Sequence, residues 1–381
     1  MTGRLVAIDL PGGSAFVEAL QRVWDDGDAA FPVDRRWPEP ARRRLLEKMA
    51  PAAIISTTGV GALDGGRPVE SRDALVVATS GSSGTPKGVV LTHDAVRASA
   101  AASNERLAVG PDDHWLACLP LAHVGGLSVV TRALLGGARL TVHDRFDPVA
   151  AMASGATMVS LVATALRRVD PTVFRTILLG GGPEPAHRPP NAVTTYGMTE
   201  TGSGVVYDGR PLDGVEVRID LDGEIHLKAP MLLRAYRDGR VPLVDGWFAT
   251  GDLGRWLDDG RLHVEGRRSD LIITGGENVW PAAVESVLRR ADGVADVAVV
   301  GEDDAQWGQA VTAYVVASDR AGAPTLDALR AAVKDELPPW CAPRRVVLVA
   351  ELPRTSLGKI ARHRLGAQPR LFTGDRPTDG R

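Results

Sequence analysis

The chain has 381 residues, 44% of them hydrophobic and 24% charged, and a formal net charge of −3. This composition is ordinary for a globular protein of two or three domains, and the charge excludes a general attraction to nucleic acid or to anionic membranes. The two cysteines, Cys118 and Cys341, stand outside any metal-binding pattern, which excludes a disulfide framework and a zinc site.

The first seventy or so residues hold a polar patch, rich in arginine and proline, over residues 34–44, with only weak periodicity. We expect this patch to wrap the surface of the main domain. From Ala74 onward, β-branched runs alternate with alanine-rich stretches of helical length, which is typical of parallel βαβ units. The expected strands are 74–79, 114–120, 139–142, 157–162, 175–182 and 192–197, and the expected helices are 94–108, 125–137, 147–154 and 163–169.

The pattern changes after Gly202. Residues 215–220 and 224–228 alternate with period two around Leu221-Asp222-Gly223, which predicts a hairpin and an antiparallel subdomain. Beyond Arg267 the pattern indicates a small α+β domain with helices over 281–291 and 326–337 and strands over 294–301, 310–317 and 344–350. The predicted fold is α/β, with a large domain over 1–268, a small mobile domain over 269–366 and a frayed, flexible tail over 367–381.

The clearest chemical signal is a glycine- and hydroxyl-rich loop after the first of these strands. Its backbone N–H groups and a lysine can cradle an anion, since glycine lets the backbone approach an oxyanion closely. It is not a Walker A loop, because Pro86 stands where that motif needs glycine and Gly88 where it needs Ser or Thr. A flexible surface loop is the alternative. The residues assigned to phosphate binding are Thr79, Ser80, Gly81, Ser82, Ser83, Gly84, Thr85 and Lys87.

Together with five later motifs in order, this loop resembles the adenylate-forming superfamily of acyl-CoA synthetases, luciferases and peptide synthetases. The resemblance extends from about Ala74 to Leu365. It implies that ATP and a carboxylic acid react to form an acyl-adenylate and that Mg²⁺ is bound during this reaction. The motifs are TSGSSGTPKGVV (79–90), LLGGGPEP (178–185), TTYGMTETGSG (194–204), GWFATGDLG (246–254), GRRSDLIITGGENVWPAAVE (266–285) and PRTSLGKIARHRL (353–365).

The resemblance assigns roles residue by residue. Glu200 matches the magnesium ligand, Thr199 a phosphate contact, and Lys359 the catalytic lysine of the small domain, whose ammonium meets the charge that grows at the α-phosphate. Asp252 and Arg267 match ribose or phosphate contacts. The remaining implied nucleotide contacts are Gly180, Gly181, Gly182, Thr195, Tyr196, Gly197 and Met198.

The second half-reaction of the family transfers the acyl group to a thiol after the small domain rotates. Ser269 matches the hinge, where much of the superfamily has Asp or Lys, and Gly275 and Gly276 match the loop that approaches the thiol tunnel. Because no carrier-protein signature follows, we expect free coenzyme A as the acceptor.

Residues 118–140 inform the choice of acid. His123 matches the gate beside the acyl pocket, with a buried core histidine as the alternative. Arg132 stands in an otherwise apolar helix, where a cation must be paired either by a second carboxylate of the substrate or by a protein carboxylate. Residues 123–132 and 157–166, which contain Gly126 and Ser160, resemble o-succinylbenzoate–CoA ligases of menaquinone synthesis. That resemblance implies a small aromatic dicarboxylate as the substrate.

Three other functions stay open: a ligase for another small acid, a stand-alone adenylation domain that loads a carrier protein, and a nucleotide-binding module without catalysis. No Asp or Glu lies in 118–135 to hold an amino group, and Lys359, Glu200 and Asp252 are all present, which disfavours the last two. No apolar run is long enough for a signal peptide or a membrane span, so we expect a cytoplasmic protein. From the net charge, we expect no nucleic-acid partner. The sequence leaves a homodimer open.

Overall fold

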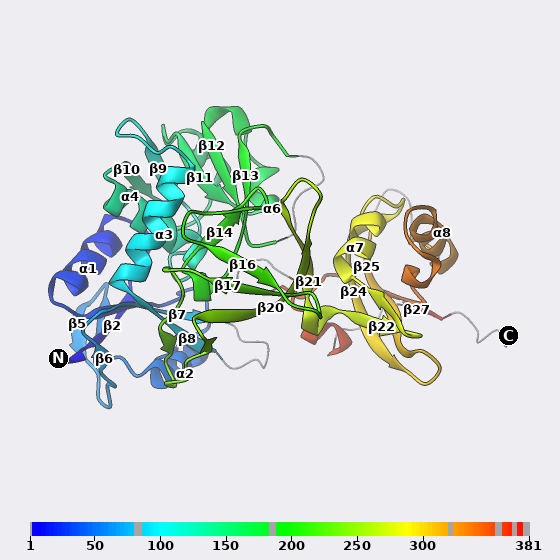
Figure 1. The fold of residues 1–381 in the computed structure, drawn as a ribbon, viewed down its shortest axis with the longest axis horizontal. Helices are drawn as coiled ribbons and strands as arrows, with labels where there is room; N and C mark the ends of the chain where they lie inside the picture. The colour runs from blue at the N-terminus through cyan, green and yellow to red at the C-terminus, as the bar shows by residue number, and fades with distance from the viewer. Residues whose placement is uncertain are drawn as a thin grey trace. The chain divides into compact units, whose positions relative to one another are not determined.

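The computed structural model describes residues 2–79, 86–182, 188–318, 323–354, 360–367 and 372–375. The α/β class is confirmed, and the ribbon is shown in Figure 1. The chain forms two compact units, whereas the domain boundary expected after residue 268 stays a prediction. The first unit contains Met1–Arg218, His226–Ala249 and Trp256–Leu262, and the second contains Ile219–Ile225, Thr250–Arg255 and His263–Arg381.

The first unit contains a seven-stranded sheet in the order β18-β8-β7-β3-β2-β4-β5. Its central pairs are parallel, β2 with β3 and β4 and β3 with β7, and antiparallel strands flank them. The strands are β2 (Leu5–Asp9), β3 (Ala29–Pro32), β4 (Ala53–Ser56), β5 (Gly59–Ala62), β7 (Asp73–Thr79), β8 (Lys87–Thr92) and β18 (Ala235–Tyr236). β1 (Thr2–Gly3) and β6 (Val69–Glu70) form a separate pair.

The strands of the first seventy residues were not predicted from the sequence. Leu5, Ala29 and Phe31 are completely buried, and β2 and β3 lie at the centre of the sheet. Parallel strands buried on both faces are short and uniformly apolar, so they carry no alternation that would reveal them in the sequence. The arginine- and proline-rich patch is mostly exposed, as expected, and continues into α2 (Glu39–Met49).

A second seven-stranded sheet of the first unit runs in the order β10-β9-β11-β12-β13-β14-β15, and its first five strands are parallel. All the strands and helices predicted between residues 74 and 197 are confirmed. The strands are β9 (His114–Ala117), β10 (Arg139–Val142), β11 (Met158–Leu161), β12 (Thr176–Leu179), β13 (Ala192–Gly197), β14 (Gly204–Tyr207) and β15 (Arg210–Pro211).

Helices connect the strands of the first unit and cover them. α3 contacts β7 and β8 of one sheet, β14 of the other, and α4 (Figure 1). It begins where the sequence predicts, because the Thr92 hydroxyl accepts a hydrogen bond from the Ala95 N–H and caps the first turn. The helices are α1 (Ser14–Asp25), α3 (His93–Arg106), α4 (Val124–Gly136), α5 (Pro148–Met152) and α6 (Ala163–Leu166).

The hairpin predicted around residues 221–223 is confirmed as neighbouring strands β16 and β17 of a five-stranded sheet. The small α+β fold beyond Arg267 is confirmed as well, with α7 and α8 packed against a six-stranded sheet. Residues 372–375, expected in a frayed tail, instead pair with β26. These strands are β16 (Glu216–Ile219), β17 (Glu224–Lys228), β19 (Leu243–Val244), β20 (Trp247–Trp256), β21 (Leu262–Arg267), β22 (Ile272–Thr274), β23 (Glu277–Val279), β24 (Val294–Asp304), β25 (Gly308–Ala317), β26 (Arg345–Leu348) and β27 (Phe372–Asp375), and the helices are α7 (Pro281–Leu288) and α8 (Leu326–Glu336).

Asp113 ties together the amino ends of three parallel strands of the second sheet. Its carboxylate accepts hydrogen bonds from Arg175 Nε and Nη2 at 2.9 and 2.8 Å and from the Thr157 hydroxyl at 2.9 Å. These residues directly precede β9, β12 and β11. Burial alone would raise the pKa of Asp113, but the hydrogen bonds from Arg175 and Gly110 outweigh it and hold the pKa below its usual value.

We therefore expect Asp113→Asn to lower the free energy of unfolding by about 1–3 kcal/mol at pH 7. A carboxylate with a lowered folded-state pKa stabilises the fold above its unfolded pKa of about 4, and this contribution is lost as the pH falls through the folded value. Urea unfolding at pH 7, 5 and 3 should thus show the difference between variant and wild type shrinking at the lowest pH. A difference that stays constant with pH would contradict the assignment.

Candidate active site

The phosphate loop itself, Ser80 to Thr85, lies outside the described residues, but both of its flanks are described. Thr79 at the end of β7 pairs with Lys87 at the start of β8, so the loop closes an antiparallel hairpin. The Lys87 Nζ lies 5.5 Å from the centre of the Tyr236 ring. The predicted phosphate-binding lysine is therefore held beside an aromatic ring at the base of the loop.

Glu200, the predicted magnesium ligand, lies in a 3-10 turn directly after β13. The Tyr236 hydroxyl donates a hydrogen bond to its Oε1 at 3.0 Å. Burial, together with the negative charge of Glu200, raises the pKa of Tyr236 well above its usual value, so the hydroxyl keeps its proton and acts as the donor. Because β18 pairs with β8, Tyr236 joins Glu200 to the strand that carries Lys87.

The glycines predicted to face the nucleotide follow β12 and end β13, two neighbouring parallel strands. Gly181 has a φ of 80°, which disfavours any other residue type. A Cβ at Gly180 would lie 2.8 Å from the Thr195 Oγ1, and one at Gly197 would lie 2.2 Å from the Ser203 carbonyl oxygen. The bare backbone is thus required by the packing of the two strand ends. A Cβ at Gly182 would meet no described atom within 4 Å, so the described residues leave this position open.

Asp252 and Arg267, the predicted ribose contacts in the second unit, are brought together by β20 and β21. Arg267 Nε lies 2.8 Å from Asp252 Oδ1, and the Asp252 side chain is buried while Arg267 is half exposed. The Asp252 backbone N–H donates to the Thr250 hydroxyl at 3.0 Å, which fixes the local backbone of β20.

The loop predicted to approach the thiol is the tip of the β22–β23 hairpin. Gly275 and Gly276 have φ values of 61° and 86°, and a Cβ at Gly275 would lie 2.8 Å from the Trp307 ring. Trp307 accepts the Gly275 N–H on its carbonyl oxygen at 2.8 Å, and Arg344 stacks on its ring at 3.7 Å. Ser269, the predicted hinge, is exposed and its hydroxyl donates to Asp270.

Lys359 lies outside the described residues, but the two sides of its loop are described. Arg354 and Ile360 form an antiparallel bridge, and the Ala361 N–H donates to the Pro353 carbonyl at 2.7 Å. After the loop, Arg362 Nη2 lies 2.6 Å from Glu285 Oε1, a carboxylate buried on α7. The base of the loop is therefore closed and anchored to α7.

The residues predicted for the acid pocket lie on α4 and β11. Gly126 lets the first turn of α4 pack against the preceding loop, because a Cβ there would lie 2.4 Å from the Leu119 carbonyl oxygen. His123 immediately precedes α4 and is mostly buried, with its Nε2 3.0 Å from the Asp34 carboxylate. Ser160, on the parallel strand β11, is buried.

Arg132 is 3% exposed, and among the described residues no carboxylate pairs with it. Its Nη2 donates to the Ser203 hydroxyl, and its guanidinium lies 5.6 Å from the centre of the Trp115 ring. Nε and Nη1 are buried without a hydrogen-bond partner among these residues. The alternative that a protein carboxylate neutralises Arg132 therefore finds no support in the described part of the chain. Ser203 lies three residues after Glu200, so Arg132 reaches the segment of the predicted magnesium ligand.

Three residues with contacts to predicted site residues were missed by the sequence analysis: Tyr236, Asp34 and Trp307. Tyr236 contacts Glu200 from 36 positions away, and Asp34 contacts His123 from 89 positions away. Partners so distant in sequence are set by tertiary structure and leave no local pattern.

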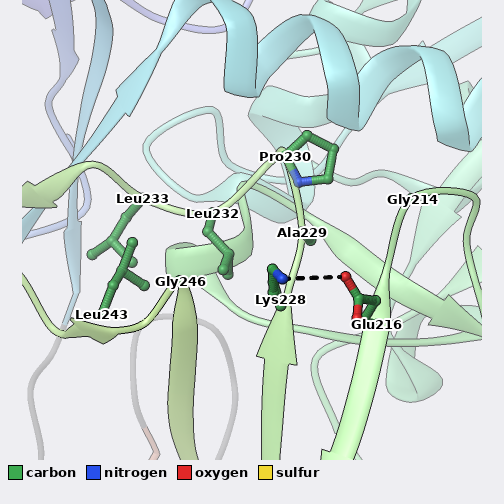
Figure 2. A pocket seen from close by; sticks show the side chains of 9 residues that line it. All are labelled: Gly214, Glu216, Lys228, Ala229, Pro230, Leu232, Leu233, Leu243 and Gly246. Carbon is green, nitrogen blue, oxygen red and sulfur yellow. Dashed lines mark ion pairs between the residues drawn. The ribbon is translucent and has the colours of Figure 1, made fainter.

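A surface cavity of about 370 Å³ lies elsewhere on the first unit and is lined by none of the predicted site residues. Figure 2 shows its ion pair, in which Lys228 Nζ lies 3.6 Å from Glu216 Oε1, opposite apolar side chains such as Leu243. One lining residue, Leu233, donates its backbone N–H to the Glu200 carbonyl at 2.8 Å. The cavity therefore borders the backbone of the magnesium-ligand turn rather than the predicted acid pocket.

The residues present fit ATP and Mg²⁺. Glu200 offers a hard carboxylate oxygen of the kind Mg²⁺ binds, with one oxygen already oriented by Tyr236. The bare glycine backbone after β12 fits a flat base, and the Asp252–Arg267 pair offers both an acceptor for ribose hydroxyls and a cation. In the described part of the chain, no helix is both long and apolar enough to cross a membrane.

Comparisons with known proteins match most of the chain. Residues 64–236 match the family model of AMP-binding enzymes, and residues 283–359 match that of the AMP-binding enzyme C-terminal domain. A probable 2-succinylbenzoate–CoA ligase of Mycobacterium tuberculosis is 39% identical over 369 residues, which cover 88% of this chain and 95% of the relative. The 2-succinylbenzoate–CoA ligase of Bacillus cytotoxicus is 37% identical over 334 residues, which cover 76% and 69%.

Solved structures of an o-succinylbenzoate CoA synthetase also resemble this chain. The o-succinylbenzoate CoA synthetase of Bacillus subtilis in complex with the acyl-adenylate intermediate OSB-AMP superposes with a TM-score of 0.86 at 29% identity, covering 97% of this chain and 89% of that one. The same enzyme in complex with ATP and magnesium superposes with a TM-score of 0.84. From its matched domains, its ordered motifs and these relatives, the chain belongs to the AMP-binding enzyme family, in its branch of 2-succinylbenzoate–CoA ligases.

Proposed function

We propose that this protein ligates o-succinylbenzoate to coenzyme A through an acyl-adenylate, with release of AMP and pyrophosphate, in menaquinone biosynthesis. ATP is the second substrate and Mg²⁺ the metal, which would neutralise phosphate charge when bound at Glu200. The relatives named 2-succinylbenzoate–CoA ligase support this activity. We also propose that the enzyme is cytoplasmic and needs no nucleic-acid partner.

The observation that carries the choice of acid is the buried guanidinium of Arg132. Burying a cation without a counter-charge is costly, and two of its nitrogens have no partner among the described residues. A dicarboxylate resolves this, because one carboxylate can react while the other accepts hydrogen bonds from Arg132. The succinyl carboxylate would be the one activated, and the aromatic carboxylate the one held.

In the first step, an oxygen of the succinyl carboxylate attacks the α-phosphorus of ATP and the bond to pyrophosphate breaks. The protein contributes charge and position rather than a nucleophile. Lys87 beside the loop and Lys359 supply positive charge to the phosphates, Tyr236 orients Glu200, and Asp252 receives the ribose hydroxyls. These roles are proposals that the described contacts of Lys87, Glu200 and Asp252 support.

In the second step, the sulfur of coenzyme A attacks the acyl carbon. A C–S bond forms, the thiol loses its proton, and AMP leaves with the oxygen that joined it to the acyl group. The turn at Gly275 and Gly276, packed on Trp307, would line the path of the thiol. Ser269, at the predicted hinge, would allow the small domain to rotate between the two steps.

The activity is tested by CoA-dependent AMP release with o-succinylbenzoate, alongside benzoate, succinate, hexanoate and a mixed amino-acid pool. We expect turnover with o-succinylbenzoate to exceed that with each other acid, and Lys359→Ala to reduce it by about 100-fold or more, because charge stabilisation at the phosphorus is lost. Preference for a monocarboxylate or an amino acid would overturn the substrate, and no AMP release with any acid would overturn the ligase.

Arg132→Met tests the acid pocket, because it removes the charge and keeps most of the volume. We expect the KM for o-succinylbenzoate to rise by about 10–100-fold, as for the loss of a charged hydrogen-bond partner, with the KM for ATP unchanged. We expect the melting temperature to stay or rise, because replacing a buried unneutralised cation by an apolar side chain removes a desolvation cost.

Arg330→Met is the matched control for this variant. Arg330 is also buried, but its Nη1 donates to the Pro343 carbonyl at 2.7 Å in the second unit. We expect this control to lower the melting temperature and leave the KM for the acid unchanged. If Arg132→Met behaves like Arg330→Met, Arg132 has a structural role and the dicarboxylate proposal loses its main support.

Tyr236→Phe tests the orientation of Glu200. Without the hydroxyl the carboxylate is no longer held, so we expect kcat/KM for ATP to fall by about tenfold at limiting Mg²⁺ and to recover in part at high Mg²⁺. The KM for the acid should change little.

Tyr314→Phe is the chemical control, because it removes another tyrosine–glutamate hydrogen bond, from Tyr314 to Glu302 in the second unit. It should lower stability without any Mg²⁺ dependence. Equal Mg²⁺ profiles of the two variants would contradict the role given to Tyr236.

A further inference from the structure

Asp34 and His123 form a buried contact between two segments that are 89 positions apart. The His123 Nε2 lies 3.0 Å from the Asp34 Oδ2, and the two side chains are 17% and 6% exposed. No motif of the sequence includes Asp34. The contact gives the N-terminal region a direct connection to a residue that the sequence assigns to the acyl pocket.

Asp34 is itself held rigidly by Arg36. The guanidinium donates from Nε to Oδ1 at 2.8 Å and from Nη2 to Oδ2 at 2.7 Å, and the Arg36 backbone N–H donates to Oδ1 at 3.1 Å. Burial alone would raise the pKa of Asp34, but the hydrogen bonds from Arg36 and His123 outweigh it and keep the pKa below its usual value. Asp34 is therefore an ionised acceptor in a fixed orientation.

The ionised carboxylate decides which nitrogen of His123 carries the proton. Because Asp34 has no hydrogen to donate, Nε2 must be the donor, and in the neutral ring Nδ1 is then the acceptor. Among the described residues nothing hydrogen-bonds to Nδ1. The ring thus presents a defined lone pair instead of a mixture of two tautomers.

The topology places this contact where the ligand residues gather. Asp34 follows β3, and β3 is the parallel neighbour of β7, whose carboxyl end leads into the predicted phosphate loop. His123 follows β9 of the other sheet and precedes α4, on which Arg132 lies nine residues later, about 13 Å along the axis. Ligands of α/β sheets bind outside the carboxyl ends of the strands. The Asp34–His123 contact joins these edges of the two sheets.

On the basis of the ligase function proposed above, we propose that Asp34 is a positioning residue, held by Arg36, that fixes the Nε2–H tautomer and the ring orientation of His123 at the entrance of the acid pocket. Asp34 acts through His123 and has no contact of its own with the acid. Arg132 holds the far end of the acid, and His123 governs its approach at the beginning of the same helix.

The test uses the full chain with Asp34→Asn, which keeps the shape but weakens the Arg36 fork and lets the ring choose either tautomer. We expect the KM for o-succinylbenzoate to rise by about tenfold, a typical cost of losing the partner that orients a functional histidine, with a smaller change in kcat and none in the KM for ATP. Asp34→Glu, which retains the charge, should restore part of this loss.

The structure offers a matched control at the other end of the same strand. Asp28 precedes β3, is also buried, and receives Arg4 Nε and Nη2 on Oδ2 at 2.9 and 2.6 Å. Asp28→Asn should lower the melting temperature about as much as Asp34→Asn while leaving the KM for the acid at the wild-type value. If the two variants have equal KM values, Asp34 has only a structural role.

A spectroscopic measurement tests the tautomer without relying on turnover. In ¹⁵N-histidine NMR spectra, with the His123 signal assigned through His123→Gln, the wild-type ring should show a protonated Nε2 and an unprotonated Nδ1, and Asp34→Asn should shift both nitrogens toward averaged values. An unchanged pair of shifts in Asp34→Asn would overturn the inference. Failure of the ligase function itself would appear separately, as wild-type protein that releases no AMP with o-succinylbenzoate.

Discussion

The parallel pairing of strands is the constraint on which the arrangement of this site depends. Parallel neighbours end at the same edge of a sheet, so the residues that follow β9, β12 and β13 gather, although β9 ends at residue 117 and β13 at residue 197. The amino ends of the same strands carry a different kind of contact, typified by the Asp113–Arg175 pair. The predicted ligand-binding residues thus lie at the carboxyl ends of these strands, and the stabilising ion pair lies at their amino ends.

Arg132 differs from the other buried charged side chains of the first unit in its lack of a counter-charge among the described residues. Buried charges in the rest of the first unit are neutralised by close partners, as with Asp28, Asp34 and Asp73. Arg132 has only the Ser203 hydroxyl and the face of Trp115. Within the described residues of the first unit, the other buried charges are neutralised and this one is not, so it is retained at a cost in stability that a ligand carboxylate offsets only when bound.

The sequence predicted the parallel βαβ units from residue 74, the hairpin around residue 222 and the small α+β unit, because periodicity and turn residues are local signals. It failed for β2 and β3, whose short apolar runs do not alternate, and for β27, whose pairing with β26 is a tertiary contact. Within the site it assigned roles to residues through the family motifs, and those roles stay predictions. It missed Asp34 and Tyr236, which act through another side chain and are found only when the contact is seen.

The close packing at Gly126 limits how this pocket can change. Because the first turn of α4 lies against the carbonyl oxygens of Leu119 and Pro120, the helix cannot shift along its axis to lengthen or shorten the space beside it. In this chain, a longer or shorter acid would therefore be accommodated by exchanging side chains on α4 and β11, with the register of α4 unchanged.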